Sequence, residues 1–175
     1  MRKFIGLLVV IGVIVASALY FGLIPSGLVP QNPTELELLE KSRETWNQKN
    51  TGGNYAYSTS FESWVGFGHE TTIFVTDNVV TGRNYSSYDA DRRPTESYEE
   101  DASTVGSNDF GAPTKTIDEL YDACADILTT KDPADNYITF RLFGDNLLSI
   151  CEYSSKSCAD DCSEGVRIDA ISFSQ

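Results

Sequence analysis

An uncharged apolar run near the N-terminus constrains this chain more than any other feature of its sequence. Residues 4–24 (FIGLLVVIGVIVASALYFGLI) contain no charged side chain and directly follow Arg2 and Lys3. A run of about 20 apolar residues can cross the hydrocarbon core of a bilayer as a helix, and basic flanks stay on the inner side. We therefore expect two parts, an N-terminal transmembrane or signal helix and a domain outside the cytoplasm.

A secretory signal peptide is the alternative interpretation of the same run. Ala16-Ser17-Ala18 has the A-x-A form of a cleavage site. The apolar run continues beyond that site as far as Ile24, which favours an uncleaved single-pass anchor with its N-terminus inside. Secretion after cleavage stays open. A buried soluble helix is disfavoured, because a helix that is apolar on all sides needs more protein around it than this chain supplies.

The rest of the chain divides into a linker and one domain. Residues 25–33 (PSGLVPQNP) contain three prolines and a glycine, which is typical of a short, partly stiff linker. Residues 34–175 are then long enough for a single extracytoplasmic domain.

The exported part is strongly acidic. All 26 acidic residues follow position 24, but only 11 of the 13 basic residues do, so this part carries an excess of 15 negative charges. Such a surface repels nucleic acid and anionic lipid headgroups. We therefore expect no nucleic-acid partner, and we attribute the acidity to solubility in preference to a recognition surface.

Two segments of the domain carry the same signal for the start of a helix. Thr34 and Thr116 are each followed three residues later by a glutamate, Glu37 and Glu119, which is the pattern of a capping box. Asn50-Thr-Gly-Gly53 is expected to end the first helix. Apolar side chains recur at helical spacing in both segments. They are Leu36, Leu39 and Trp46 in the first, and Ile117, Leu120, Tyr121, Cys124, Ile127 and Leu128 in the second.

Strand patterns follow each predicted helix. They cover residues 54–61, 70–76 and 79–85 in the first half, and 137–143, 147–153 and 165–173 in the second. Asp77-Asn78 and Gly144-Asp145-Asn146 separate neighbouring strands and tolerate the left-handed backbone of tight hairpins. This order predicts an α+β fold, with an antiparallel sheet of about five or six strands and two helices packed on one face.

The segment between the two halves has no such pattern. Residues 86–116 are polar and acidic, contain few aliphatic side chains and show no periodicity. A stretch of this kind predicts a long acidic loop, and solvated disorder is favoured over a functional loop.

The chain contains four cysteines, at Cys124, Cys151, Cys158 and Cys162. An even number in an exported chain predicts two disulfides. The intervening stretches of 26, 6 and 3 residues contain no C-x2-C pair, so a zinc site or a redox motif is disfavoured. Four cysteines allow three pairings. We favour joining Cys124 to Cys151, which would link the second helix to a strand and leave Cys158 with Cys162.

Residues suited to catalysis or metal binding are few. His69 is the single histidine and stands beside Glu70, but no G-x-S-x-G or H-E-x-x-H motif accompanies it. Asp160 and Asp161 are adjacent, and the acidic segments lack the spaced oxygens and turn glycine of a calcium loop. We therefore expect no catalytic residue, metal or cofactor.

An aromatic strip is the candidate binding surface. Its members are Tyr55, Tyr57, Phe61, Trp64 and Phe67. Exposed rings on a sheet would indicate an interface, whereas buried rings would only cover the core beneath the first helix. The predicted function is a non-catalytic module, membrane-tethered or secreted, that binds another envelope or extracellular protein. The alternatives are a hydrolase that uses His69 and a calcium-dependent adhesion module.

Four stretches also carry a resemblance to a known family. They are the step from Trp46 to Tyr55-Ala-Tyr57, the hairpin TIFVTDNVV, the helix start TIDELYD at 116–122 and the closing CADDCSEGVRIDAISF. Together they resemble a family of domains of unknown function from bacterial secreted proteins and lipoproteins, over roughly residues 40–173. The resemblance implies location and shape but no reaction. This chain lacks a lipid-bearing cysteine, and residues 86–116 are expected to be an insertion.

Overall fold

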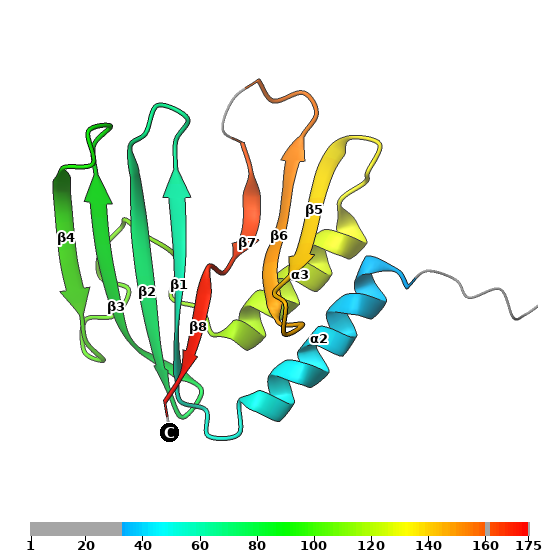
Figure 1. Cartoon of the computed structure of the whole chain (residues 1–175), viewed down its shortest axis with the longest axis horizontal. Coiled ribbons are helices and arrows are strands. Elements are labelled where there is room, and N and C mark those ends of the chain that lie inside the picture. Colours follow the sequence, from blue (N-terminus) through cyan, green and yellow to red (C-terminus); the bar gives the residue numbers. More distant parts are fainter. Residues whose placement is uncertain (1–32, 160–161, 175) are drawn as a thin grey trace, which may run out of the picture. The chain divides into compact units, whose positions relative to one another are not determined.

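The computed structural model describes residues 33–159 and 162–174 (Figure 1). The predicted transmembrane or signal helix at 4–24 and all but the last residue of the 25–33 linker lie outside the described residues. In the described part of the chain, no helix combines the length and the apolar character needed to cross a membrane. From Pro33 onward the chain forms one compact unit.

Both predicted helices and both capping boxes are confirmed. The helices are α2 (Glu35–Lys49) and α3 (Ile117–Thr130). At α2 the Thr34 N–H donates to Glu37 Oε2 at 2.7 Å, and the Glu37 N–H donates to Thr34 Oγ1 at 3.2 Å. Thr116 and Glu119 repeat this exchange at α3, at 2.7 and 3.3 Å. The local sequence is therefore sufficient to start each helix.

The α+β class is confirmed, but the prediction of a single sheet is wrong. The strands are β1 (Tyr55–Glu62), β2 (Gly68–Thr76), β3 (Val79–Tyr88), β4 (Pro94–Glu100), β5 (Asn136–Leu142), β6 (Leu148–Ser155), β7 (Glu164–Arg167) and β8 (Ala170–Phe173). They form a five-stranded sheet in the order β4-β3-β2-β1-β8 and a three-stranded sheet in the order β5-β6-β7 (Figure 1). Every pairing is antiparallel.

The division arises in the last predicted strand, residues 165–173. This stretch makes two strands, of which β7 pairs with β6 and β8 pairs with β1. Between them the Ile168 N–H donates to the Ser149 carbonyl at 2.7 Å, and the Asp169 N–H donates to the Ser58 carbonyl at 2.8 Å. Successive backbone groups thus bond to different sheets. Alternation of side chains predicts an extended chain but does not specify which strand that chain will pair with.

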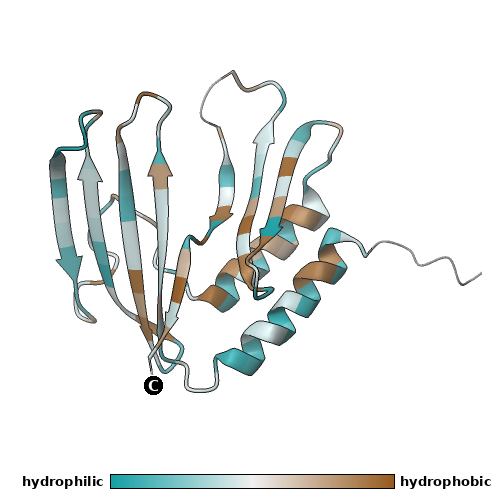
Figure 2. Ribbon diagram, in the orientation of Figure 1, coloured by the Kyte–Doolittle hydropathy of each residue, from teal (hydrophilic) through white to brown (hydrophobic). Residues whose placement is uncertain are grey.

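The prediction that residues 86–116 lack regular structure is wrong in part, since strands occupy residues 86–88 and 94–100. Strand β3 continues to Tyr88, and β4 pairs with it from Pro94 to Glu100. The sequence PTESYEE is polar on both faces, so no hydrophobic alternation indicates the strand (Figure 2). Antiparallel pairing with β3 stabilises β4 although the side-chain pattern of β4 does not indicate a strand. Residues 89–93 form the turn between these strands, and residues 101–116 form a longer connection without helix or strand.

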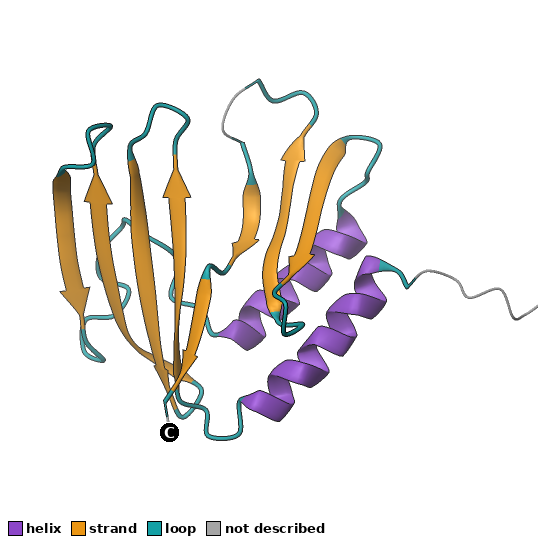
Figure 3. Ribbon diagram, in the orientation of Figure 1, coloured by secondary structure: helices purple, strands orange, loops and turns teal. Residues whose placement is uncertain are grey.

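The core lies where both helices meet the sheets. Trp46 of α2, Tyr121 of α3 and Leu148 of β6 are among its fully buried side chains. The Tyr121 hydroxyl is 2.7 Å from Ser42 Oγ on α2 and accepts the Leu148 N–H at 3.1 Å, so one ring connects three elements. Both helices lie beside the three-stranded sheet (Figure 3).

Two disulfides are present in the described residues, in the pairing favoured from the sequence. Cys124 of α3 bonds to Cys151 of β6, with the Cα atoms 5.5 Å apart. Cys158 bonds to Cys162 in the loop before β7, with the Cα atoms 6.3 Å apart. Both are consistent with an oxidising, extracytoplasmic location.

Candidate functional site

The structure divides the predicted aromatic strip into a buried and an exposed part. Tyr55 and Tyr57 are buried in the core, whereas Phe61, Trp64 and Phe67 are 39%, 83% and 48% exposed. Strand β1 begins beside the helices and ends at the free tip of the β1–β2 hairpin (Figure 1). The position of each ring along the strand decides how exposed it is. The alternation of side chains does not encode that position.

The two buried tyrosines position the start of α3. The Ile117 N–H donates to the Tyr55 hydroxyl at 3.0 Å, and the Tyr57 hydroxyl donates to the Lys115 carbonyl at 2.7 Å. Burial raises the pKa of Tyr55 to about 12 and raises the pKa of Tyr57 as well. Both phenols therefore stay neutral, and these two residues belong to the scaffold.

The exposed rings continue into the protein as a row. The Phe67 and Phe61 ring centroids lie 6.3 Å apart, and Phe61 stacks on His69 at 5.6 Å. His69 lies 5.5 Å from Tyr85, which stacks on Tyr98 at 5.0 Å. The row crosses β1, β2, β3 and β4 on one face of the sheet, because these residues are cross-strand or diagonal neighbours.

Residues 101–116 cover the inner end of this row. Gly111 has a φ of +87°, and a Cβ there would lie 2.9 Å from Tyr85 Cδ2 and 3.1 Å from the Tyr98 hydroxyl. The Tyr98 hydroxyl also donates to the Phe110 carbonyl. Only glycine lets the backbone lie directly on these two rings, so the row is closed at this end and open at Phe61.

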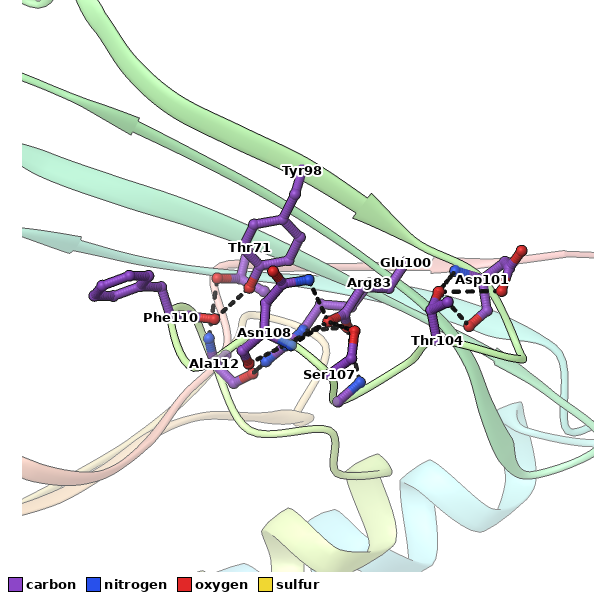
Figure 4. Close-up of polar contacts among 11 residues, drawn as sticks. Thr71, Arg83, Tyr98, Glu100, Asp101, Thr104, Ser107, Asn108, Phe110 and Ala112 are labelled. Carbon is purple, nitrogen blue, oxygen red and sulfur yellow. Dashed lines mark hydrogen bonds and ion pairs between the residues drawn. The ribbon is translucent and has the colours of Figure 1, made fainter.

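A buried ion pair holds the same segment in place (Figure 4). Arg83 binds Glu100 through two hydrogen bonds, Nε to Oε2 at 2.8 Å and Nη2 to Oε1 at 2.9 Å. Arg83 also donates to the Asn108 and Ala112 carbonyls, at 2.7 and 2.9 Å. Glu100 accepts the N–H groups of Gly106 and Asn108, at 2.8 and 2.9 Å. The charges are thus satisfied by each other and by the segment that covers them.

This environment shifts both ionisable groups toward their charged forms. Hydrogen bonds from Arg83 are the largest cause of the lowered pKa of Glu100, and the amides of Gly106 and Asn108 add to it against the effect of burial. The bond to Glu100 in turn raises the pKa of Arg83. Sequence reasoning missed this cluster. Its one signal was an arginine on the same strand face as Tyr85.

A cleft of about 520 Å³ opens between the two sheets at the exposed end of the row. Its walls come from β1, β2, β6, β7, α3 and the connection before α3. Among the lining residues are Tyr57, Phe61, His69, Leu120, Val166 and Arg167. This volume lies within the range of natural ligand sites.

Several polar groups at the rim of the cleft are already paired. Arg167 makes two hydrogen bonds to Glu152, at 2.9 and 3.0 Å. The Ser60 hydroxyl donates to Asp169 Oδ2 at 2.7 Å. The cleft therefore combines an aromatic and aliphatic floor with a hydrogen-bonded rim, which suits binding more than bond cleavage.

His69 lies in the wall of this cleft but not beside Glu70. Its Nδ1 is buried and has no hydrogen-bond partner among the described residues, and burial lowers the pKa of the ring. Successive residues of a strand face opposite ways, so Glu70 lies on the other face of β2. A catalytic histidine is normally oriented by a partner on its second nitrogen. The geometry does not bring His69 and Glu70 together.

The described part of the chain contains no candidate metal site. Across residues 33–159 and 162–174, no group of three or more His, Cys, Asp or Glu could hold an ion. Asp160 and Asp161 lie outside these ranges.

Comparisons with protein-family models, curated proteins and solved structures find no significant match. The resemblance to the domain family of secreted proteins and lipoproteins thus stays a prediction.

Proposed function

We propose that this chain is a non-catalytic extracytoplasmic binding module. Residues 4–24 would tether it to the membrane, or be removed on secretion. The cleft between the two sheets, with the aromatic hairpin tip beside it, would bind a segment of another envelope or extracellular protein.

The exposed end of the aromatic row carries this proposal. Phe61, Trp64 and Phe67 expose large apolar surfaces on a single hairpin, together with Val65 at 44% exposure. Contiguous exposed apolar surface is typical of binding sites, and aromatic residues are enriched at the centres of protein interfaces. The protein is otherwise strongly acidic, so these side chains contrast sharply with the surface around them.

Site-specific photocrosslinking in the source cells would test this function. Trp64 is replaced by p-benzoylphenylalanine in the full chain, and a matched chain carries the same photoreactive group at Tyr137. Tyr137 is 65% exposed and lies on β5, away from the cleft. We expect a discrete crosslinked protein from position 64 that position 137 does not produce.

A second variant makes the test specific to the patch. Phe61→Ser with Phe67→Ser, in the chain that carries the crosslinker at position 64, should remove the product if these rings form the binding surface. Equal products from positions 64 and 137, or a product insensitive to both serine substitutions, would rule out this surface as the binding site.

A further inference from the structure

Among residues 33–159 and 162–174, two strand edges that border the cleft have no neighbouring strand. Strand β8 pairs with β1 only from Tyr55 to Ser58, so Thr59–Glu62 extend beyond its end. Strand β7 is the outer strand of the three-stranded sheet and pairs only with β6. In Figure 1 this part of β1 and β7 face each other above β8.

The parity of hydrogen bonding shows which backbone groups of β1 point into the cleft. The Ser58 carbonyl accepts the Asp169 N–H, so Ser58 directs its backbone groups toward β8. Every second residue of a strand directs them to the same side. Ser60 and Glu62 therefore present N–H and C=O groups toward the cleft, while Thr59 and Phe61 are bonded toward β2.

The backbone groups of β7 alternate in the same way on the opposite side of the cleft. The Ile168 N–H bonds to Ser149 of β6, whereas the Asp169 N–H bonds to Ser58 of β1. By alternation, Gly165 and Arg167 direct their backbone groups away from β6 and toward β1. Within the described residues, these groups and those of Ser60 and Glu62 make no hydrogen bond to another segment. Two open edges thus face each other.

The close approach of β7 to β6 keeps the second edge in position. Gly165 has a φ of +139°, and a Cβ there would lie 2.3 Å from the Cys151 carbonyl oxygen. Below the edges, Leu120, Val166 and Tyr57 form a buried apolar floor. An extended chain between the edges would direct alternate side chains onto this floor and the others into solvent.

We infer that the cleft binds an extended polypeptide segment by β-strand addition, with hydrogen bonds to Ser60 and Glu62 on one side and to Gly165 and Arg167 on the other. This inference rests on the proposed binding function and specifies its ligand. Main-chain bonds provide affinity in this binding mode, and the floor selects alternate apolar side chains. The four edge residues Thr59–Glu62 match about 13 Å of extended chain.

Charge at the rim favours a basic segment. Glu164 and Asp169 flank the two edges, and neither forms an ion pair with a cation of the described residues. Arg167 is neutralised by Glu152. A lysine or arginine on the solvent-facing side of the bound segment would meet these carboxylates, so the ligand combines alternate apolar residues with at least one basic residue.

The test begins with random ten-residue peptides displayed on phage and selected on the immobilised full chain in mild detergent. A selected peptide is synthesised with free amides and with its central amides N-methylated, which retains the side chains but removes strand hydrogen bonding. Strand addition predicts roughly tenfold or greater loss of affinity on methylation. Selection on the Phe61→Ser/Trp64→Ser chain is the control for the site.

Hydrogen exchange and one substitution locate the contact. Peptide should slow amide exchange at Ser60, Glu62, Gly165 and Arg167, with no change at Thr59, which is already bonded to β2. Ser60→Pro removes an N–H that has no partner within the fold, which is tolerated at a strand edge. It should abolish peptide binding. Ser60→Ala is the matched control, because it also removes the hydroxyl bond to Asp169 but keeps the N–H, so it should bind the peptide more tightly than Ser60→Pro does.

The possible outcomes distinguish failure of strand addition from failure of the proposed binding function. Peptides that bind equally well after methylation, without new protection at the four edge amides, would overturn strand addition and leave the binding function intact. Edge amides as protected as Thr59 in the free chain would show that the edges close on each other, and would also overturn it. Self-association that Ser60→Pro abolishes would identify a second copy as the occupant. Failure to select any peptide above the control chain would overturn strand addition, and the crosslinking result at position 64 would then decide the binding function by itself.

Discussion

Helix α3 and residues 101–116 both cover the sheets of this protein, and they are attached by different physical means. Helix α3 has an apolar stripe, is buried against β6 and β7 and is bonded to β6 through Cys124–Cys151. Residues 101–116 are polar, and they are attached through Arg83 and Glu100, both almost fully buried. A segment that buries little apolar surface needs strong hydrogen bonds, and charged partners provide them.

The difference predicts different sensitivities. A disulfide stabilises mainly by restricting the unfolded chain, so it responds to reductant and not to acid. A buried ion pair requires both charges, so it responds to acid and to loss of either partner.

Removing one member of the ion pair should have the largest effect. Arg83→Met leaves the Glu100 carboxylate buried without its cation and should lower the free energy of unfolding by about 3–5 kcal/mol, measured by urea titration. Arg83→Met with Glu100→Leu removes both charges and should lose less than the single variant. A single variant within 1 kcal/mol of the native chain would contradict the role given to this pair.

Removing the disulfide of α3 should rank next. Cys124→Ala with Cys151→Ala opens a loop closed across 27 residues, and the chain-entropy relation predicts a loss of about 3–4 kcal/mol. The matched control is Cys158→Ala with Cys162→Ala, whose separation is 4 residues and whose loss should be about 2 kcal/mol. Equal losses from the two pairs would show that loop length does not set the effect.

Acid should weaken the ion pair and leave the disulfide contribution unchanged. The pKa of Glu100 is lowered from its ordinary value of 4.5, so its contribution is complete above about pH 4.5 and is lost progressively as the pH falls below that value. Glu100→Gln imitates the protonated acid. The stability difference between the native chain and Glu100→Gln should therefore shrink below pH 4.5, while the offset of Cys124→Ala/Cys151→Ala stays constant.

The smallest effect on stability should come from His69, which takes part in neither the disulfide nor the ion pair. Burial lowers its pKa from 6.5, so the unfolded chain takes up a proton first as the pH falls below about 6.5, and stability decreases. His69→Phe keeps a ring between Phe61 and Tyr85 and should remove this slope between pH 7 and 5. His69 is the single histidine of the chain. If the thermal midpoint of His69→Phe still fell with pH as steeply as that of the native chain, His69 would not be the group responsible.

Features encoded by neighbouring residues were predicted well. Both capping boxes and the Asp77-Asn78 turn, with φ values of +51° and +60°, depend on residues within a few positions of each other. The candidate site was predicted only in part. The aromatic strip was identified, but the division between core and surface was not, because burial depends on where the helices lie along β1.

The sequence by itself determined where this protein's helices and hairpins begin, and that its four cysteines would pair with one another. Those outcomes follow from local hydrogen bonding, backbone preference and redox environment. Only the tertiary structure decided that residues 165–173 serve two sheets, that Arg83 meets Glu100, and that two open strand edges border one cleft. Each depends on partners distant in the chain, and a pattern of side chains does not specify which distant backbone a strand will meet.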